Sequence, residues 1–301
     1  MSAELQKTLQ ALLGHRARFG RPLGRYTTWR IGGPAWCLAT VHSAQEAAEV
    51  IRATEEAGLP WMPLGRGSNL LVRDGGYRGV MLRLGGPLAR LRLEDGQICG
   101  GGGTSLPGAV KLAARQGLTG LEWAAGIPAS LGGAVINNAG AMGRDLAACC
   151  REITLLMPDG TIRKAPAQEF PAVYRRRQLP AGSVVLGAKL ELEPQEPGLV
   201  AARTRAILER RRASQPLEAA TAGSVFKNPP GDYAGRLIEA AGCKGLSRGD
   251  AVVSTRHANF IENRGRASAA QVLELMAEIS RRVREQFGVE LEPEVEVVGD
   301  D

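Results

Sequence analysis

A long apolar run crowded with glycine, alanine and asparagine constrains this chain more than any other feature. The run LEWAAGIPASLGGAVINNAGAMG, residues 121–143, contains no lysine. Its glycines can adopt positive φ and let a ligand approach the main chain closely: Gly126, Gly132, Gly133, Gly140 and Gly143. Backbone N–H groups that such a path leaves unpaired can bind phosphate oxygens. A tightly packed seam inside a sheet would use the same residues, so the run alone leaves both interpretations open.

A second glycine-bearing loop favours the phosphate interpretation. LGRGSNLLV, residues 64–72, places a short polar turn between two strand-like apolar pieces. The turn does not match the dinucleotide fingerprint G-x-G-x-x-G, because Leu70 stands where the third glycine belongs. The P-loop string G-x-x-x-x-G-K-[ST] occurs nowhere in the chain. The sequence therefore indicates a phosphate-binding protein with neither a dinucleotide-binding fingerprint nor a P-loop.

Length and residue usage predict a protein with buried cores. The chain has 301 residues, of which 44% are hydrophobic, enough for two or three modules. Leucines at helical spacing near the N-terminus lack the pattern of a signal peptide. No apolar stretch is both long enough and poor enough in glycine to predict a membrane span. We therefore expect a cytoplasmic protein.

Cysteine and histidine usage gives no sign of a metal or disulfide framework. The five cysteines are odd in number and form no C-x-x-C pair, so we expect reduced, mostly buried thiols. The three histidines, His15, His42 and His257, have no ligand-like spacing, which favours structural or surface roles. The sequence predicts no metal site.

The charge balance favours anionic partners. The formal net charge is +7 and the pI about 9.5. The triplets Arg175–Arg177 and Arg210–Arg212 resemble nucleic-acid patches, but aromatic residues make up only 4% of the chain and form no stacking platform. A solvated helix face or a phosphate clamp explains them better.

Hydrophobic periodicity and turn residues divide the chain into three regions. Strands at 36–41, 59–64 and 77–84, with a helix from the capping box at Ser43 to 57, predict an opening βαβ-type module. Turns at 94–96 and 158–160, a helix at 106–116 and a strand at 183–192 predict a mainly β middle. Helices are expected at 199–212, 233–241 and 268–287, the last opened by a capping box from Ser268 to Gln271.

Two polar segments of the third region could hold chemistry. GSVFKNPP, residues 223–230, places a hydroxyl, an ammonium and an amide within five residues, although an ordinary helix-entry loop would also use such residues. Near the C-terminus, alternation is expected to send Glu292, Glu294 and Glu296 to one face of a strand. That face could be a solvated edge, or it could border a cleft and raise a carboxyl pKa.

Five segments in order resemble the UDP-N-acetylenolpyruvoylglucosamine reductase family. They are YTTWRIGGPA from Tyr26, LGRGSNLLV, GLEWAAGIPASLGGAVINNAGAMG, GSVFKNPPGDYAGRLIEAAG and LEPEVEVVG. The resemblance spans nearly the whole chain, and five ordered motifs are much more specific than one. It implies a flavoenzyme that completes UDP-N-acetylmuramate for peptidoglycan synthesis.

The resemblance implies an α+β fold with an FAD-binding part of the vanillyl-alcohol-oxidase (PCMH) type. Two FAD-binding subdomains, 1–85 and 86–196, would be followed by a substrate-binding domain, 197–301. FAD would be bound without a covalent link, since the first loop offers no histidine. The residues expected to bind FAD lie in the two glycine-rich segments: Gly65, Arg66, Gly67, Ser68, Asn69, Leu70, Ala125, Gly126, Ile127, Pro128, Ser130, Gly132, Gly133, Asn137, Asn138 and Gly140.

The reaction that the resemblance implies has two half-reactions. NADPH gives a hydride to the flavin, which passes it to C3 of the enolpyruvyl group of UDP-N-acetylglucosamine enolpyruvate. By motif, Ser224 would donate the proton to C2, while Arg175 and Glu294 would stabilise the enol form. Lys227 and Asn228 would hold the substrate, a UDP-sugar. No nucleic acid, membrane insertion or second subunit is implied.

The chain departs from the family pattern at one catalytic position. The family reads Tyr-Arg-x-Ser where this chain has Tyr174, Arg175, Arg176 and Arg177. The arginine that directly follows the tyrosine is therefore the expected catalytic residue, with its two neighbours as alternatives. The chain resembles the shorter variety of the family, which lacks an inserted tyrosine-bearing loop.

Two other functions remain as alternatives at this point. A flavin oxidase of the same fold would keep the glycine-rich segments but would not require Ser224, Arg175 and Glu294 together. A nucleic-acid-binding protein driven by the positive charge would contain no flavin.

Overall fold

The middle of the chain forms a five-stranded antiparallel sheet, as its short strands and tight turns predict. The computed structural model describes residues 2–301, and this sheet has the order β12-β11-β15-β7-β6. The turns at 94–96 and 158–160 connect neighbouring strands, which confirms both predictions. The strands are β6 (Leu91–Glu94), β7 (Gln97–Gly101), β11 (Cys150–Leu156), β12 (Ile162–Pro166) and β15 (Val184–Leu190).

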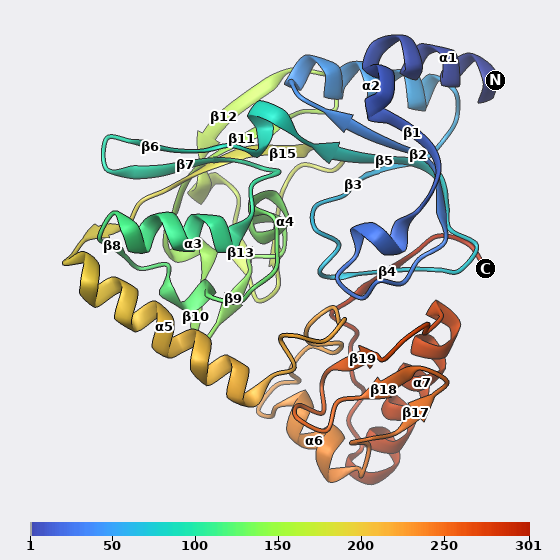
Figure 1. Ribbon diagram of the computed structural model, residues 1–301, viewed down its shortest axis with the longest axis vertical. Helices are drawn as coiled ribbons and strands as arrows, with labels where there is room; N and C mark the ends of the chain where they lie inside the picture. Colours follow the sequence, from blue (N-terminus) through green and yellow to red (C-terminus); the bar gives the residue numbers. More distant parts are fainter. Residues whose placement is uncertain (1) are drawn as a thin grey trace. The chain divides into compact units, whose positions relative to one another are not determined.

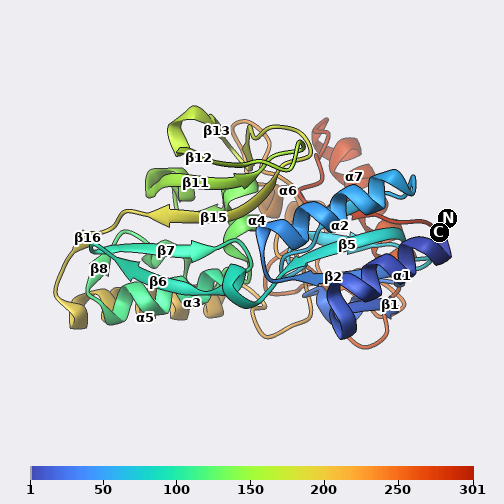
Figure 2. The same cartoon turned by 90° about the horizontal axis from the view of Figure 1, so that it is seen from above.

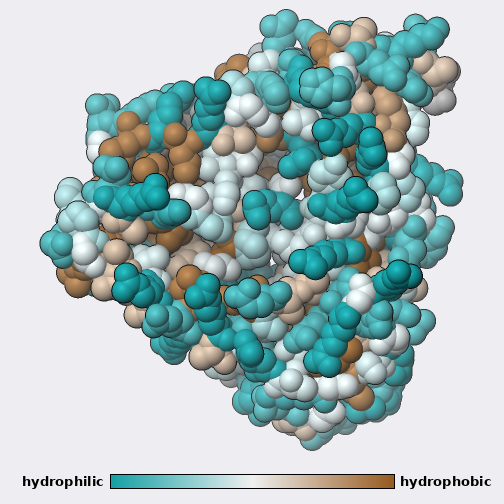
Figure 3. Space-filling view, viewed as in Figure 1, coloured by the Kyte–Doolittle hydropathy of each residue, from teal (hydrophilic) through white to brown (hydrophobic). Residues whose placement is uncertain are grey.

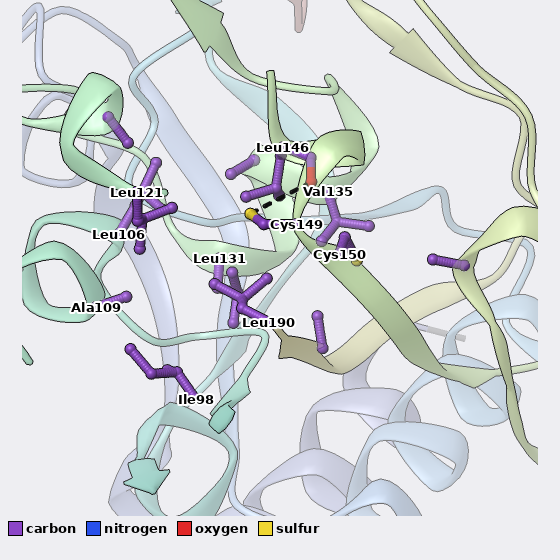
Figure 4. Close-up of a cluster of buried hydrophobic side chains, with 14 of the residues drawn as sticks. Ile98, Leu106, Ala109, Leu121, Leu131, Val135, Leu146, Cys149, Cys150 and Leu190 are labelled. Atoms are coloured by element: carbon purple, nitrogen blue, oxygen red, sulfur yellow. Dashed lines mark hydrogen bonds between the residues drawn. The ribbon is translucent and has the colours of Figure 1, made fainter. Parts of the chain in front are cut away.

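Two helices pack against this sheet and close its core. They are α3 (Leu106–Arg115) and α4 (Leu131–Ile136), and each begins at a serine whose hydroxyl accepts a backbone N–H three residues on. Figure 4 shows side chains of α3 and α4, including Leu106 and Leu131, gathered with Ile98 of β7 and Leu190 of β15. The apolar face of each helix therefore drives its packing.

A second sheet lies at the N-terminal end, with the order β1-β2-β5-β3. Helix α2 packs against α1 and β3, and Figure 2 shows α2 alongside β5. The Ser43 hydroxyl caps α2 by accepting the N–H of Glu46, as its sequence predicts. The elements are α1 (Ser2–Leu13), β1 (Ala17–Pro22), β2 (Pro34–Val41), α2 (Ala44–Glu56), β3 (Trp61–Pro63) and β5 (Tyr77–Leu84).

By packing, the chain separates into two units. The first unit consists of residues 1–19, 37–66 and 79–209, and the second of residues 20–36, 67–78 and 210–301. The division into domains 1–85, 86–196 and 197–301 stays a prediction, because a unit defined by packing need not coincide with a domain defined by sequence.

The first unit also contains three short antiparallel strand pairs. They join β9 (Gly140–Ala141) to β10 (Arg144–Asp145), β13 (Ala172–Val173) to β14 (Arg176–Arg177), and β8 (Leu118–Thr119) to β16 (Glu193–Pro194).

The second unit is built around the long helix α7 (Ala269–Phe287). Its capping box at Ser268 and Gln271 is formed as predicted, and its apolar stripe is buried from Val272 to Val283. Figure 1 shows α7 behind a small antiparallel sheet of β17 (Ser247–Arg248), β18 (Ala251–Val253) and β19 (Ile261–Asn263). The buried Trp29 donates from Nε1 to the Ile261 carbonyl at 2.7 Å, which ties an N-terminal segment into this core. On the face drawn in Figure 3, these C-terminal elements present mainly hydrophilic residues.

The remaining elements largely follow the sequence pattern, with one error. Helices α5 (Pro197–Ser214) and α6 (Ala234–Ala240) match their predictions. The strand predicted over 291–299 is wrong in its first half, because β20 covers only Glu296–Val298, paired in parallel with β4 (Leu70–Val72). Pro293 lacks an N–H and forms only an isolated bridge with Phe226. Glu292 is consequently exposed and Glu294 half-buried.

Residues 2–301 contain neither a membrane-spanning helix nor a cluster of metal-binding side chains. No helix there is both long and apolar enough to span a membrane. Nor do three histidine, cysteine, aspartate or glutamate side chains gather anywhere in that range as a metal site would require.

The cysteines are expected to be unreactive in the folded protein. Cys37, Cys149, Cys150 and Cys243 are buried, as predicted, and Cys99 is half-buried. Burial raises the pKa of Cys149 to about 12 and that of Cys150 to about 11, so almost no thiolate forms at pH 8. A thiol-specific disulfide reagent should therefore label only Cys99 in native protein and all five thiols in denaturant. Rapid native labelling of more than one thiol would contradict this packing.

Candidate functional site

Within the first unit, Gly65 and Arg66 of the first glycine-rich segment contact the long glycine-rich run. A Cβ atom on Gly65 would lie 2.3 Å from the Ser130 hydroxyl oxygen, so any larger residue would require the serine or the loop to move. The next residue, Arg66, donates from Nε to the Pro128 carbonyl at 3.1 Å. Ser130 is buried and caps α4 by accepting the N–H of Gly133 at 3.2 Å. Residues more than sixty positions apart in sequence thus form one continuous main-chain surface.

This surface carries backbone donors that the protein does not use. None of the five N–H groups from Gly65 to Asn69 donates a hydrogen bond to another residue within 2–301. The same holds for the N–H groups of Gly126 and Ala129. Unpaired N–H groups on glycine-rich backbone fit an anionic group such as a pyrophosphate. The residues present therefore fit the phosphates of FAD.

Some of the glycines also form the packing seam that the sequence left open. A Cβ atom on Gly132 would lie 3.0 Å from the Gly102 carbonyl oxygen, which accepts the Gly132 N–H at 2.8 Å. Gly102 and Gly103 are tighter still, because a Cβ on either would come within 2.2 Å of a carbonyl oxygen. The run of four glycines from 100 to 103 is the sequence signal for this close packing. The packing interpretation therefore holds at Gly132, and phosphate binding by other residues of the run stays a prediction.

The expected catalytic arginine lies at the turn of a short hairpin in the first unit. Arg175 follows β13 and has a positive φ of 60°, a strained backbone conformation for a non-glycine residue. Its Nη1 donates to the Gly140 carbonyl at 2.9 Å, so it touches the glycine-rich run. The buried Asn138 donates from Nδ2 to the Val173 carbonyl at 3.2 Å and thereby holds the same hairpin. Strain is often kept where a side chain must be aimed.

The neighbouring arginines have different surroundings. Arg176 is exposed. Arg177 is buried, and its Nη1 donates to the carbonyls of Ala167 and Phe170 at 2.8 and 3.0 Å. The residue that stands in place of the family's serine is therefore directed into the protein interior. This geometry favours Arg175 as the functional arginine.

In the second unit, the Ser224 loop is hydrogen-bonded to the segment that carries Glu294. The Glu294 N–H donates to the Val225 carbonyl at 2.8 Å, and the Lys227 N–H donates to the Glu292 carbonyl at 2.8 Å. The Lys227 ammonium also forms an ion pair with Glu292. Ser224, Lys227 and Glu294 are thus brought together although seventy residues separate the two segments.

Asn69 fixes Glu294 from the other side. Its Nδ2 donates to the Glu294 carbonyl at 3.0 Å, and its own carbonyl accepts the Glu296 N–H at 3.0 Å. The side chain predicted to bind FAD therefore also holds the main chain of the predicted catalytic glutamate. This link starts the parallel pairing of β4 with β20.

Ser224 and Asn228 open onto a pocket with a volume of about 470 Å³. The Asn228 Oδ1 accepts the N–H of Ala234 at 3.1 Å, which orients its amide. Lys227 and Glu294 do not line this pocket. The other lining residues are Tyr233, Gly235, Arg236, Glu239, Arg256, His257, Ala258 and Asn259.

The pocket combines fixed cations with a neutral imidazole. Arg256 donates from Nη1 to the Arg212 carbonyl at 2.9 Å, which holds its guanidinium in place. Burial lowers the pKa of His257, and the positive charge of Lys244 lowers it further. Its Nδ1 accepts the Asn259 N–H at 3.3 Å, so the ring hydrogen is assigned to Nε2. Sequence analysis did not select Arg256 or His257, because scattered cations and histidines carry no motif.

Two family models match the chain. "FAD binding domain" matches residues 35–166, and "UDP-N-acetylenolpyruvoylglucosamine reductase, C-terminal domain" matches residues 215–298. The first match contains both glycine-rich segments, and the second contains Ser224 and Glu294.

Similar proteins that are named UDP-N-acetylenolpyruvoylglucosamine reductase match nearly the whole chain. UDP-N-acetylenolpyruvoylglucosamine reductase 2 of Symbiobacterium thermophilum is 45% identical over 94% of this chain and 92% of its own length. The enzyme of Heliobacterium modesticaldum is 46% identical over 93% of this chain and 90% of its own. The solved structure of the UDP-N-acetylenolpyruvylglucosamine reductase from Thermus caldophilus superimposes with a TM-score of 0.83 at 40% identity, covering 94% of this chain and 100% of that chain.

These matches agree with the two glycine-rich segments and the Ser224 loop in both position and order. The α+β fold with an FAD-binding part is confirmed. The chain belongs to the UDP-N-acetylenolpyruvoylglucosamine reductase family of FAD-binding oxidoreductases.

Proposed function

We propose that this enzyme uses NADPH to reduce the enolpyruvyl group of UDP-N-acetylglucosamine enolpyruvate, giving UDP-N-acetylmuramate for peptidoglycan synthesis. The observation that carries the proposal is the Ser224 loop, which opens onto the pocket while it is hydrogen-bonded to the Glu294 segment. The names of the similar proteins point to the same substrate. The enzyme would act as a monomer in the cytoplasm.

FAD would be bound through backbone donors. The N–H groups from Gly65 to Asn69 fit the pyrophosphate, with Gly126 and Ala129 beside Ser130 as further donors. FAD, when bound, would take a hydride from NADPH and supply it to C3 of the enolpyruvyl group. The loop contains no histidine or cysteine that could form a covalent link, so binding would be non-covalent.

Side chains of the protein would donate the proton to C2 and stabilise the negative charge that develops beside it. Ser224 would give its hydroxyl proton to C2, because a carbanionic carbon is basic enough to take a proton from a positioned hydroxyl. The Arg175 guanidinium would face the carboxylate on which negative charge develops, and its planar fork suits two carboxylate oxygens. Glu294 would polarise the enol form from the second unit.

Substrate binding would fall to the second unit. Lys227 and Asn228 adjoin Ser224 and would hold the phosphate or carboxylate oxygens of the UDP-sugar. Arg236 and Arg256 line the pocket onto which Ser224 and Asn228 open. Arg236 is paired with Asp232 and Glu239 with Lys244, so Arg256 supplies the positive charge of the pocket. A pocket of this charge suits an anionic nucleotide.

The absorption spectrum of the purified protein tests the proposal. NADPH, added without oxygen, should bleach the visible flavin band, and the band should recover only when UDP-N-acetylglucosamine enolpyruvate follows. Recovery only with oxygen would favour a flavin oxidase of the same fold. A protein that cannot take up FAD would contradict both functions.

Replacing Gly65 with alanine is expected to weaken FAD binding about tenfold or more. The new Cβ would lie 2.3 Å from the buried Ser130 hydroxyl oxygen, so either the cap of α4 or the loop must move. Such overpacking costs about 1–3 kcal/mol. FAD affinity can be measured by fluorescence quenching as apoprotein is titrated into FAD.

Gly108→Ala provides the matched control for that substitution. Gly108 lies in α3, where a Cβ would meet no atom closer than 3.6 Å. Its variant should bind FAD like the wild type. Equal FAD affinity in the Gly65 variant would remove the support for this loop as a flavin contact.

A further inference from the structure

A buried amide holds the backbone of the Ser224 loop. The Asn259 side chain is buried, with 3% of the residue exposed. Its Oδ1 accepts the Phe226 N–H at 3.0 Å, and its Nδ2 donates to the Phe226 carbonyl at 2.8 Å. The Asn259 carbonyl also accepts the Val225 N–H at 2.9 Å. The asparagine thus binds the loop as the edge of a strand would, through one donor and two acceptors.

The Glu294 segment binds the opposite edge of the same three residues. The Val225 carbonyl accepts the Glu294 N–H, and the Lys227 N–H donates to the Glu292 carbonyl, both at 2.8 Å. Residues 225–227 are therefore held from both sides, by Asn259 and by the segment before β20. Ser224 immediately precedes this clamped stretch and has none of these bonds itself.

Core packing alone would not orient this backbone. The Phe226 side chain is buried in the core of the second unit, with 1% of the residue exposed. A buried ring fixes the place of Cα but leaves the adjoining peptide planes free to rotate. The Asn259 amide holds both planes from one side, because it contacts the N–H and the carbonyl of the same residue, while the Glu294 segment bonds the Val225 carbonyl and the Lys227 N–H of those planes from the other.

We propose that Asn259 is a positioning residue for Ser224: its amide, opposite the Glu294 segment, keeps the peptide planes of Phe226 in place and thereby the direction of the serine hydroxyl. The proposal rests on the proposed function, in which Ser224 gives a proton to C2. Proton transfer depends steeply on geometry, and an error of about 1 Å can cost roughly 100-fold in rate. Asn259 should therefore affect the second half-reaction and not the reduction of the flavin.

Asn259→Asp tests this role with almost no change of shape. The carboxylate can still accept the Phe226 N–H, but it repels the Phe226 carbonyl that the amide bound. Once protonated, the carboxyl group can donate to that carbonyl and restore the pattern. Burial beside a carbonyl oxygen is expected to raise the pKa of this carboxyl group. The defect should therefore shrink as the pH falls.

The expected result is a pH-dependent loss in one half-reaction. At pH 8, reoxidation of the reduced flavin by the enolpyruvyl nucleotide should be about 100-fold slower than in wild type, with reduction by NADPH within twofold. Near pH 5.5 the ratio of variant to wild-type rate should rise at least tenfold. Taking the ratio at each pH removes the titration that both proteins share. The other charged groups near the loop are Lys227, Arg236, Glu239, Arg256, His257, Glu292 and Glu294.

Asn263→Asp is the matched control. The Asn263 side chain also donates to a main-chain carbonyl, that of Trp29 at 3.0 Å, and accepts two N–H groups, but it does not contact the Ser224 loop. This variant should lose thermal stability to a similar extent while both half-reactions stay within twofold of wild type. An equal loss of reoxidation rate in both variants would overturn the positioning role.

Two further results separate failure of this proposal from failure of the proposed function. If Ser224→Ala leaves reoxidation unchanged, the proton-donor role fails first. If Ser224→Ala slows reoxidation but Asn259→Asp does not at any pH, only the positioning role fails. Should the Asn259 variant not fold, hydrogen exchange of the wild type still decides: the Phe226 N–H should exchange as slowly as amides within α7, and exchange at the rate of an open loop would overturn the proposal.

Discussion

Replacing Ser224 with alanine is expected to leave flavin reduction by NADPH within about twofold and to slow reoxidation by the enolpyruvyl nucleotide about 10²- to 10⁴-fold. That range is the usual contribution of a positioned general acid. The loop around Ser224 is held through main-chain bonds at 225–227, none of which involves the hydroxyl. The alanine variant should therefore keep the geometry of the loop and lose only the proton source. Single-turnover kinetics without oxygen would measure each half-reaction separately.

Ser247→Ala serves as the control for this variant. Ser247 lies exposed in β17 of the same unit and does not line the pocket. It should behave as wild type in both half-reactions and in thermal unfolding. If Ser224→Ala slowed both half-reactions equally, Ser224 would be a structural residue, and the proton would have to come from another donor in the pocket.

Local sequence signals predicted most of the secondary structure. The capping box at Ser268 and Gln271 fixes the start of α7, and an apolar stripe at helical spacing fixes the face it buries. The strand at 77–84 was predicted to the residue. Such signals depend only on neighbouring residues, so a single sequence contains them in full. The strand predicted over 291–299 was wrong in its first half because alternation does not reveal that Pro293 interrupts the ladder.

Contacts between distant segments could not be predicted in the same way. Asn259 and Phe226 are thirty-three residues apart, and nothing in either segment indicates that an amide from one binds the backbone of the other. The same is true of Asn69 with Glu294. Motif resemblance proposed the residues Ser224, Arg175 and Glu294, whereas the residues that hold them emerged only from the fold. Positioning groups have no fixed spacing, because many backbone paths can bring an amide to a peptide plane.

Of the three consecutive arginines, Arg175 is expected to have the largest effect on the rate of flavin reoxidation. Arg175→Ala should slow reoxidation by the enolpyruvyl nucleotide about 10²- to 10³-fold, the usual loss when a donor to a developing oxyanion is removed. Flavin reduction by NADPH should change much less, because no carboxylate charge develops in that step. Arg175→Lys should recover only part of the loss, since lysine keeps the charge but not the planar fork. Single-turnover rates of the three proteins at saturating substrate provide the measurement.

Variants at Arg176 and Arg177 test whether the effect belongs to Arg175 itself or to the positive charge of the whole hairpin. Arg176 is exposed, so Arg176→Ala should leave both half-reactions and thermal stability unchanged. Arg177 donates to the carbonyls of Ala167 and Phe170 in the interior, and Arg177→Ala should lower stability by about 1–3 kcal/mol because it leaves buried acceptors unpaired. Its folded fraction should still reoxidise at a rate much closer to wild type than Arg175→Ala. If Arg176→Ala instead carried the large kinetic loss, the catalytic register would lie one residue further along, and the strained φ of Arg175 would then serve to aim its neighbour.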